Sequence, residues 1–223
     1  MPSQTQVRGT TSTPTTGSST DPGTPAVTQT GGNAAAQDRL KKVSGPIGRV
    51  WNHVLGQPEG TNSATATVDQ AMIRAYLDRR LGFAEGEFFR GAKLDGVAEK
   101  LATMLDTDGD GKVTWPEFAA FEGQIMGMLA PGSDKPGADA GALAGKEHGR
   151  VAGTDGKADV GELTAANTAR VPKGTEHADL IGQLGARVAI DAADRDEGNK
   201  PIGQRSLSRE EWTGAAAEIA GRK

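Results

Sequence analysis

The 223-residue sequence predicts an all-α fold preceded by a disordered N-terminal tail. Apolar residues recur at three- and four-residue spacings from about residue 44 to residue 220, as they do on the buried faces of helices. No segment alternates apolar and polar residues for long enough to predict an ordinary strand. Only 35% of the residues are hydrophobic and 32 are glycine, so we expect part of the chain to lie outside any core.

The tail comprises residues 1–38, which are rich in Thr, Ser, Pro and Gly. It has too few large apolar side chains to offset a backbone-ordering cost of roughly 1–2 kcal/mol per residue, so we expect it to be disordered. Two interpretations remain open at this point. The segment is either a passive extension or the export segment of a secreted bacterial effector.

Six amphipathic stripes follow the tail, and each predicts a helix. They cover Ile47–Leu55, Val68–Leu81, Leu94–Leu105, Phe118–Leu129, Ile181–Val188 and Trp212–Ile219. Residues 131–150, between the fourth and fifth stripes, are rich in Gly and Ala and contain two prolines. We expect them to form a flexible linker between residues 39–130 and residues 151–223.

The strongest motif lies between the third and fourth stripes, at residues 106–117 (DTDGDGKVTWPE), and it fits the twelve-residue calcium-loop pattern at every position. A hard divalent cation takes roughly six to eight oxygen ligands, and Gly111 permits the sharp turn that wraps the chain around it. Without a cation the crowded carboxylates would repel one another. The expected ligands are Asp106, Asp108, Asp110, the carbonyl of Lys112, Thr114 through a water molecule, and both carboxylate oxygens of Glu117.

Thr114 and Glu117 also form a Thr-x-x-Glu capping box that starts the next helix. Val113, just before it, is the apolar residue expected to pair as a short strand with a partner loop. With these features, residues 94–129 resemble an EF-hand. Hands of this family usually occur in pairs, so the resemblance implies further loops elsewhere in the chain.

Three other capping boxes, each preceded by an apolar residue, indicate where those loops lie. They are Thr67–Gln70 after Ala66, Asp159–Glu162 after Ala158, and Ser208–Glu211 after Leu207. The loop-closing positions 70, 117, 162 and 211 are nearly evenly spaced, which indicates an internal repeat. The layout resembles the four-hand sarcoplasmic and calerythrin-like calcium-binding proteins. That resemblance implies one compact globule with two EF-hand pairs, in residues 39–130 and 151–223.

The other three loops depart from the calcium pattern. The first, residues 59–70, has Thr61 and Ser63 at acidic positions and Gln70 at the closing position, so we expect it to be structural. The third has Val151 and Gly153 at its first two ligand positions, and the fourth spans eighteen residues instead of twelve. The secondary candidate metal ligands are Asp155, Asp159 and Glu162 in the third loop, and Asp194, Asp196 and Glu211 in the fourth.

Ca²⁺ is therefore the predicted cofactor. One intact loop is an inefficient store, so we expect a calcium-responsive sensor or binding module with a protein partner. The alternatives are a calcium buffer and a leaderless secreted bacterial effector that calcium folds. Met104, Met126 and Met128 flank the loop, and such residues suit either an adaptable partner surface or the core.

Composition excludes several other classes of function. The chain has no cysteine, so it has no disulfide, no thiolate-ligated zinc and no iron–sulfur cluster. Its net charge of −4 is opposite in sign to that of a phosphate-neutralising nucleic-acid binder. No apolar run approaches the roughly 18 residues of a membrane-spanning helix, and residues 1–30 do not read as a secretory signal. We expect no nucleic-acid partner, no membrane span, and a cytoplasmic location or, as the alternative, secretion without a cleavable signal peptide.

We also expect no enzymatic activity. His53, His148 and His177 are scattered along the chain, His53 on a helix and the other two in linkers. None has a zinc-ligand spacing or a nucleophile beside it. The pairs Lys41–Lys42 and Arg79–Arg80 are expected to be solvated helix faces.

Overall fold

The computed structural model describes residues 42–83 and 94–221, so the predicted tail, residues 1–38, lies outside the described residues. The described chain is mainly helical, which confirms that part of the prediction. It also contains two small antiparallel sheets, each made of two short strands. The helices and strands follow one another as four helix–loop–helix segments.

The first two segments precede residue 130. The first consists of α2 (Gly45–Val54), β1 (Thr67–Val68) and α3 (Gln70–Ala75), which the π-helical η1 (Tyr76–Arg80) continues. The second consists of α4 (Leu94–Leu105), β2 (Val113–Thr114), α5 (Trp115–Ala120) and α6 (Glu122–Leu129).

The last two segments complete the described chain. The third consists of α7 (Ala140–Val151), β3 (Ala158–Asp159) and α8 (Val160–Thr168). The fourth consists of α9 (Ala178–Ala193), the 3₁₀-helix η2 (Ile202–Gln204), β4 (Ser206–Leu207) and α10 (Arg209–Ala220).

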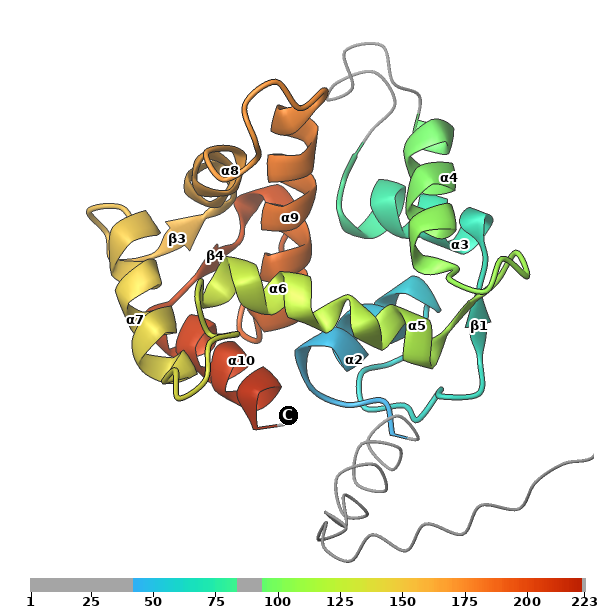
Figure 1. Ribbon diagram of the computed structural model, residues 1–223, viewed down its shortest axis with the longest axis horizontal. Coiled ribbons are helices and arrows are strands. Elements are labelled where there is room, and N and C mark those ends of the chain that lie inside the picture. The colour runs from blue at the N-terminus through green and yellow to red at the C-terminus, as the bar shows by residue number, and fades with distance from the viewer. Residues whose placement is uncertain (1–41, 84–93, 222–223) are drawn as a thin grey trace, which may run out of the picture.

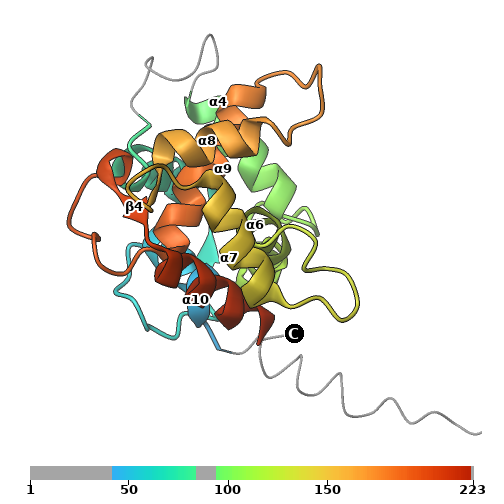
Figure 2. The ribbon, with the colours of Figure 1, turned by 90° about the vertical axis from the view of Figure 1, so that its left-hand side faces the viewer.

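Each sheet joins the loops of two consecutive segments. β1 pairs with β2, with Val68 opposite Val113, and β3 pairs with β4, with Ala158 opposite Leu207. All four of these side chains are buried. Figure 1 shows most of the first two segments on one side of the molecule and most of the last two on the other. One helix from each half, α6 and α9, lies near the middle. Figure 2, turned by 90°, shows α7 and α10 side by side, and these two helices are in contact.

Three buried tryptophans anchor the core. Trp51 of α2 packs against Trp115 of α5, with ring centroids 5.8 Å apart. Trp212 of α10 donates a hydrogen bond from its indole nitrogen to the Leu129 carbonyl at the end of α6 (2.6 Å). The second and fourth segments are therefore connected through the core as well as by the chain.

The capping boxes predicted at Thr114, Asp159 and Ser208 all form, and each starts a helix. The one predicted at Thr67–Gln70 is wrong. Asp69 caps α3 instead, because its Oδ1 accepts a hydrogen bond from the Met72 amide (2.9 Å).

The strand residue of the first loop is consequently Val68 and not Ala66. The helix predicted over residues 68–81 is therefore wrong at its start, because Val68 lies in β1. Val68 is fully buried, whereas Ala66 is only partly buried. Burying valine removes more apolar surface from water than burying alanine does, and aspartate is a stronger N-cap than threonine. Both preferences favour the observed register, two residues beyond the predicted one.

The predicted flexible linker, residues 131–150, is wrong from residue 140 onward, where α7 begins. Asp139 caps this helix by accepting a hydrogen bond from the Ala142 amide (3.0 Å). Ala140 and Ala144 are buried. Small residues produce little apolar periodicity in a sequence, but alanine has the highest helix propensity, and α10 provides a surface against which this helix packs.

Gly182 allows α8 and α9 to approach closely. A Cβ at this position would lie 2.0 Å from Oγ1 of Thr168 and 3.0 Å from the backbone carbonyl of Thr164, both on α8. We expect Gly182→Ala to lower the free energy of unfolding by about 1–3 kcal/mol, as overpacking does, in a urea titration. The matched control is Gly214→Ala in α10, where nothing lies within 4 Å of the added Cβ. This control should instead raise stability by about 0.5–1 kcal/mol, and equal effects from the two substitutions would contradict the proposed close approach.

Candidate metal centre

The loop between α4 and α5 begins at Asp106, whose carboxylate organises the first turns. Its Oδ1 accepts a hydrogen bond from the Gly109 amide, and its Oδ2 accepts one from the Gly111 amide, both at 2.8 Å. Gly109 and Gly111 have φ values of 76° and 83°, a conformation that favours glycine. The chain therefore wraps around the Asp106 carboxylate, with the positive φ that the sequence predicts at Gly111.

Glu117, in the first turn of α5, ties the start of the loop to its end. Its Oε2 accepts hydrogen bonds from the amide and hydroxyl of Thr114 (2.8 and 2.7 Å). Its Oε1 accepts from the amide and hydroxyl of Thr107 (2.8 and 2.9 Å). These bonds, those of Thr114 first, lower the pKa of Glu117 from 4.5 to about 2.

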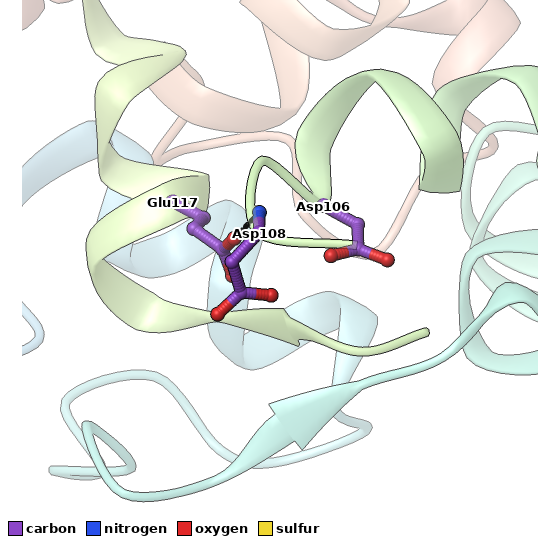
Figure 3. Close-up of side chains that lie close together, drawn as sticks. All are labelled: Asp106, Asp108 and Glu117. Carbon is purple, nitrogen blue, oxygen red and sulfur yellow. Dashed lines mark hydrogen bonds between the residues drawn. The ribbon is translucent and has the colours of Figure 1, made fainter. Parts of the chain in front are cut away.

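Three carboxylates converge at this loop. Asp106, Asp108 and Glu117, the acidic cluster, each place one oxygen within 4.8 Å of the others. Figure 3 shows Glu117 reaching from α5 toward Asp108, with Asp106 at the end of α4. Among residues 42–83 and 94–221, this is the one group of three His, Cys, Asp or Glu side chains that meets the spacing. Carboxylate oxygens are the ligands that a hard divalent cation prefers, so the residues present fit a metal ion.

The other predicted ligands of this loop lie beside the acidic cluster but outside it. Oδ1 of Asp110 accepts a hydrogen bond from the Lys112 amide (2.8 Å), which turns this carboxylate toward the loop backbone. The Thr114 hydroxyl donates to Glu117.

The lowered pKa of Glu117 makes the stability of the metal-free protein depend on pH. Because the carboxyl has a pKa of about 2 when folded and about 4.5 otherwise, its contribution is present above pH 4.5 and is lost as the pH falls toward 2. In chelator, an NMR titration of the Glu117 carboxyl carbon should have its midpoint near 2. Thr114→Val removes one donor and should raise that midpoint. The same midpoint near 4.5 in both proteins would contradict the hydrogen-bonded arrangement.

Two polar side chains of the first loop, Ser63 and Glu59, contact α2, and Thr61 donates its hydroxyl to the Pro58 carbonyl within the loop. The Ser63 hydroxyl donates to Oδ1 of Asn52 on α2 (2.6 Å), and Oε1 of Glu59 lies 3.2 Å from Nε2 of His53 on the same helix. The side-chain amide of Gln70 donates from Nε2 to the Asp95 carbonyl of α4 (3.4 Å). These contacts hold the loop against the helices.

The third loop does not bring its candidate ligands into such a group. Asp159 accepts from the Glu162 amide (2.8 Å) and donates its own amide to Oε2 of Glu162 (3.1 Å), while Oδ1 of Asp155 accepts from the Lys157 amide. The Glu162 carboxylate lies over Gly153, where a Cβ would be only 2.2 Å from Oε1. The space that an acidic side chain would need at position 153 is therefore filled by Glu162.

The fourth loop uses its candidate ligands for internal hydrogen bonds. Oδ1 of Asp194 accepts from the amides of Asp196 (3.0 Å) and Glu197 (2.9 Å). Oε1 of Glu211 accepts from the Arg195 amide (3.0 Å), so Glu211 ties the loop together much as Glu117 does. Burial raises the pKa of the Asp194 carboxyl, against the effect of the two amides.

No protein-family model matches this chain, and no curated protein or solved structure matches it. None of the described helices has the length and apolar character needed to cross a bilayer.

Sequence reasoning missed a buried polar cluster around Asp191 of α9. Oδ2 of Asp191 accepts from the Tyr76 hydroxyl and lies 2.9 Å from Nδ1 of His53, and its Oδ1 accepts from Nε of Arg80 (2.6 Å). We call these four residues the Asp191 cluster. Burial opposes ionisation of Asp191, but the hydrogen bond and charge of His53, followed by Arg80 and Tyr76, outweigh it and lower the pKa of the carboxyl.

The Asp191 cluster shows that the prediction of a solvated helix face at Arg79–Arg80 is wrong for Arg80. Arg80 is not simply on a solvated helix face, because it pairs with a carboxylate that is fully buried. Tyr76 and Arg80 are the two ends of the π-helical η1, and both reach the same side chain of α9. A π-helical turn often marks a functional or strained position, but nothing local in the sequence announces one here.

The histidines are placed partly as predicted. His53 is on α2, whereas His148 is in α7 and buried instead of in a linker. Nε2 of His148 lies 3.2 Å from the Leu207 carbonyl, and the ring packs edge-on against Trp212. His177 immediately precedes α9.

Proposed function

We propose that this protein binds calcium through residues 106–117 and responds to the ion as a sensor or binding module. The observation that carries the proposal is the acidic cluster, held in a loop whose turns at Gly109 and Gly111 leave carboxylate oxygens pointing to one place. Asp110, the Lys112 carbonyl and Thr114 supply the remaining oxygens. Bound calcium would supply positive charge that offsets the repulsion among these carboxylates.

We further propose that the four helix–loop–helix segments are EF-hands arranged in two pairs. Two observations support this assignment. The β1–β2 and β3–β4 sheets link consecutive loops through buried apolar residues, and Val113 pairs with the first loop. Glu117, Glu162 and Glu211 each close a loop from the first turn of the following helix.

An apolar pocket beside the loop favours a responsive module over a buffer. Both helices that flank the loop contribute to it. Leu101, Met104 and Leu105 of α4 line it together with Phe118 of α5 and the adjoining Phe121. Met104 is 51% exposed, so this part of the apolar lining is open to solvent. A change in the angle between α4 and α5 on ion binding would therefore change an apolar surface that suits a protein partner.

Counting bound ions tests the calcium proposal. Native mass spectrometry of the full chain should show one calcium ion per molecule, and magnesium serves as the control ion. Calcium should also raise the thermal midpoint over chelator, because a ligand at 100 times its Kd stabilises the folded state by about 2.7 kcal/mol. A chain that retains no ion and melts identically in calcium and chelator would rule out binding. Three or more tightly bound ions would support a buffer instead.

A hydrophobic dye tests the response separately. If calcium alters the apolar pocket that α4 and α5 help to line, the fluorescence of an apolar-surface dye should change on calcium addition and revert with chelator. Calcium binding with no dye response would favour a stabilised module over a sensor.

A further inference from the structure

The fourth loop begins at a buried carboxylate, Asp194, one oxygen of which has no hydrogen-bond partner. The Asp191 and Asp194 side chains, at the end of α9, are both fully buried. Amides from the loop satisfy Oδ1 of Asp194, but its Oδ2 has no hydrogen-bond partner although it is buried. A buried carboxylate oxygen without a partner is costly unless a positive charge lies nearby.

Arg205 supplies that charge from inside the same loop. The residue is 4% exposed, and its Nη1 lies 3.6 Å from Oδ2 of Asp194 and 3.9 Å from Oδ1 of Asp191. Its Nε donates to the Lys200 carbonyl (2.7 Å), and its Nη2 donates to the Gly198 carbonyl (2.6 Å). The guanidinium therefore faces two carboxylates and two backbone carbonyls, the oxygen types that surround a hard cation in a protein.

We propose that the guanidinium of Arg205 is the built-in cation of the fourth loop and occupies the place that a metal ion would otherwise take. The loop spans eighteen residues, from 194 to 211, against twelve for residues 106–117, and the longer path brings residue 205 back into its centre. Arginine remains charged throughout the physiological pH range and cannot be removed by a chelator. The fourth loop thus keeps its fold at any calcium concentration, and Asp194 is not free to bind calcium while Arg205 is present.

This inference concerns the fourth loop alone and does not require calcium to bind at residues 106–117. Its consequence for the whole protein is that the two halves respond differently to calcium. Calcium would act on the half that contains α4 and α5, while the half that contains α9 and α10 keeps a permanent cation.

Thermal unfolding in chelator tests the charge directly. Arg205→Met keeps most of the length and apolar stem of the side chain but removes the positive charge that faces the buried Asp194 carboxylate, so it should lower the midpoint by about 10 °C. Arg205→Lys keeps the charge, although it cannot donate to both carbonyls at once, so it should lose less. An Arg205→Met protein with the same thermal midpoint as the wild-type protein would overturn the proposal. An Arg205→Lys protein no more stable than Arg205→Met would overturn it as well.

Calcium binding in a Glu117→Gln background tests whether the guanidinium stands in a cation site. This background is used so that calcium bound at residues 106–117 does not mask the result. With Arg205 in place, Asp194→Asn should not change the number of calcium ions counted by native mass spectrometry. The Glu117→Gln/Arg205→Ala protein should gain one ion, together with calcium-dependent stabilisation. If this protein is unfolded in chelator, calcium-dependent recovery of helical circular dichroism is the equivalent readout.

Two results in this background would overturn the inference. One is an ion that is lost on Asp194→Asn while Arg205 is present, because the fourth loop would then take metal beside the arginine. The other is a Glu117→Gln/Arg205→Ala protein that neither binds nor responds to calcium. Failure of the calcium proposal for residues 106–117 would appear differently. The wild-type protein would then bind no calcium, while the Arg205 variants would behave as expected.

Discussion

Glu117→Gln is expected to weaken calcium binding by on the order of 100-fold or more, since affinity in such loops depends strongly on ligand charge and on the bidentate closing glutamate. The substitution removes one negative charge and one carboxylate oxygen from the acidic cluster. Glutamine still has a carbonyl oxygen that can accept from the Thr114 amide, as Oε2 of Glu117 does at 2.8 Å. The start of α5 should therefore still form, although the folded protein loses the stability that the ionised Glu117 contributes. The weakened affinity is therefore measured under conditions in which both proteins are folded.

Isothermal titration calorimetry measures this effect. The matched control is Glu162→Gln, the same chemical change at the corresponding position of α8, where the glutamate also closes a capping box. A second control is Gln70→Ala, since Gln70 lies at the start of α3 and outside the acidic cluster. Both controls should leave the affinity of the loop at residues 106–117 nearly unchanged. Equal weakening by Glu117→Gln and Gln70→Ala would mean that this loop is misassigned.

Asp191→Asn is expected to lower the free energy of unfolding by about 3–5 kcal/mol, the usual cost of removing one partner from a buried ion pair. Arg80 would lose a carboxylate that now lies 2.6 Å from its Nε, and the Tyr76 hydroxyl would lose a charged acceptor. Because the folded pKa of Asp191 lies below its usual value of about 3.8, this contribution is fully present at neutral pH. It is lost only as the pH falls through the folded pKa.

Urea titration at neutral pH measures the loss, and Asp78→Asn is the matched control. Asp78 pairs with Arg74 at 3.8 Å, but both side chains are more than a third exposed. A surface pair of this kind contributes only about 0–1 kcal/mol. A similarly small loss for Asp191→Asn would show that the Asp191 cluster does not hold α2, η1 and α9 together.

The intact loop illustrates what sequence alone predicts well. Its Gly111 turn and its capping box both form as predicted, because residues within twelve positions of one another decide them. The capping boxes at Asp159 and Ser208 were predictable for the same reason. The first loop shows the limit of this reasoning, because Thr67 and Asp69 are both reasonable caps. The choice between them depended on which apolar residue β2 would bury.

By itself, therefore, the sequence determined the helical character of the described chain and the loop at residues 106–117, because hydrogen bonds and helical periodicity within a few residues decide both. Only the tertiary structure decided the register of the first loop, the helix at Ala140–Val151 and the polar contacts inside the fourth loop. His53 meets Asp191 across 138 positions of sequence. Whether such residues meet depends on how whole helices pack, and packing is a balance of buried area and charge over the entire core.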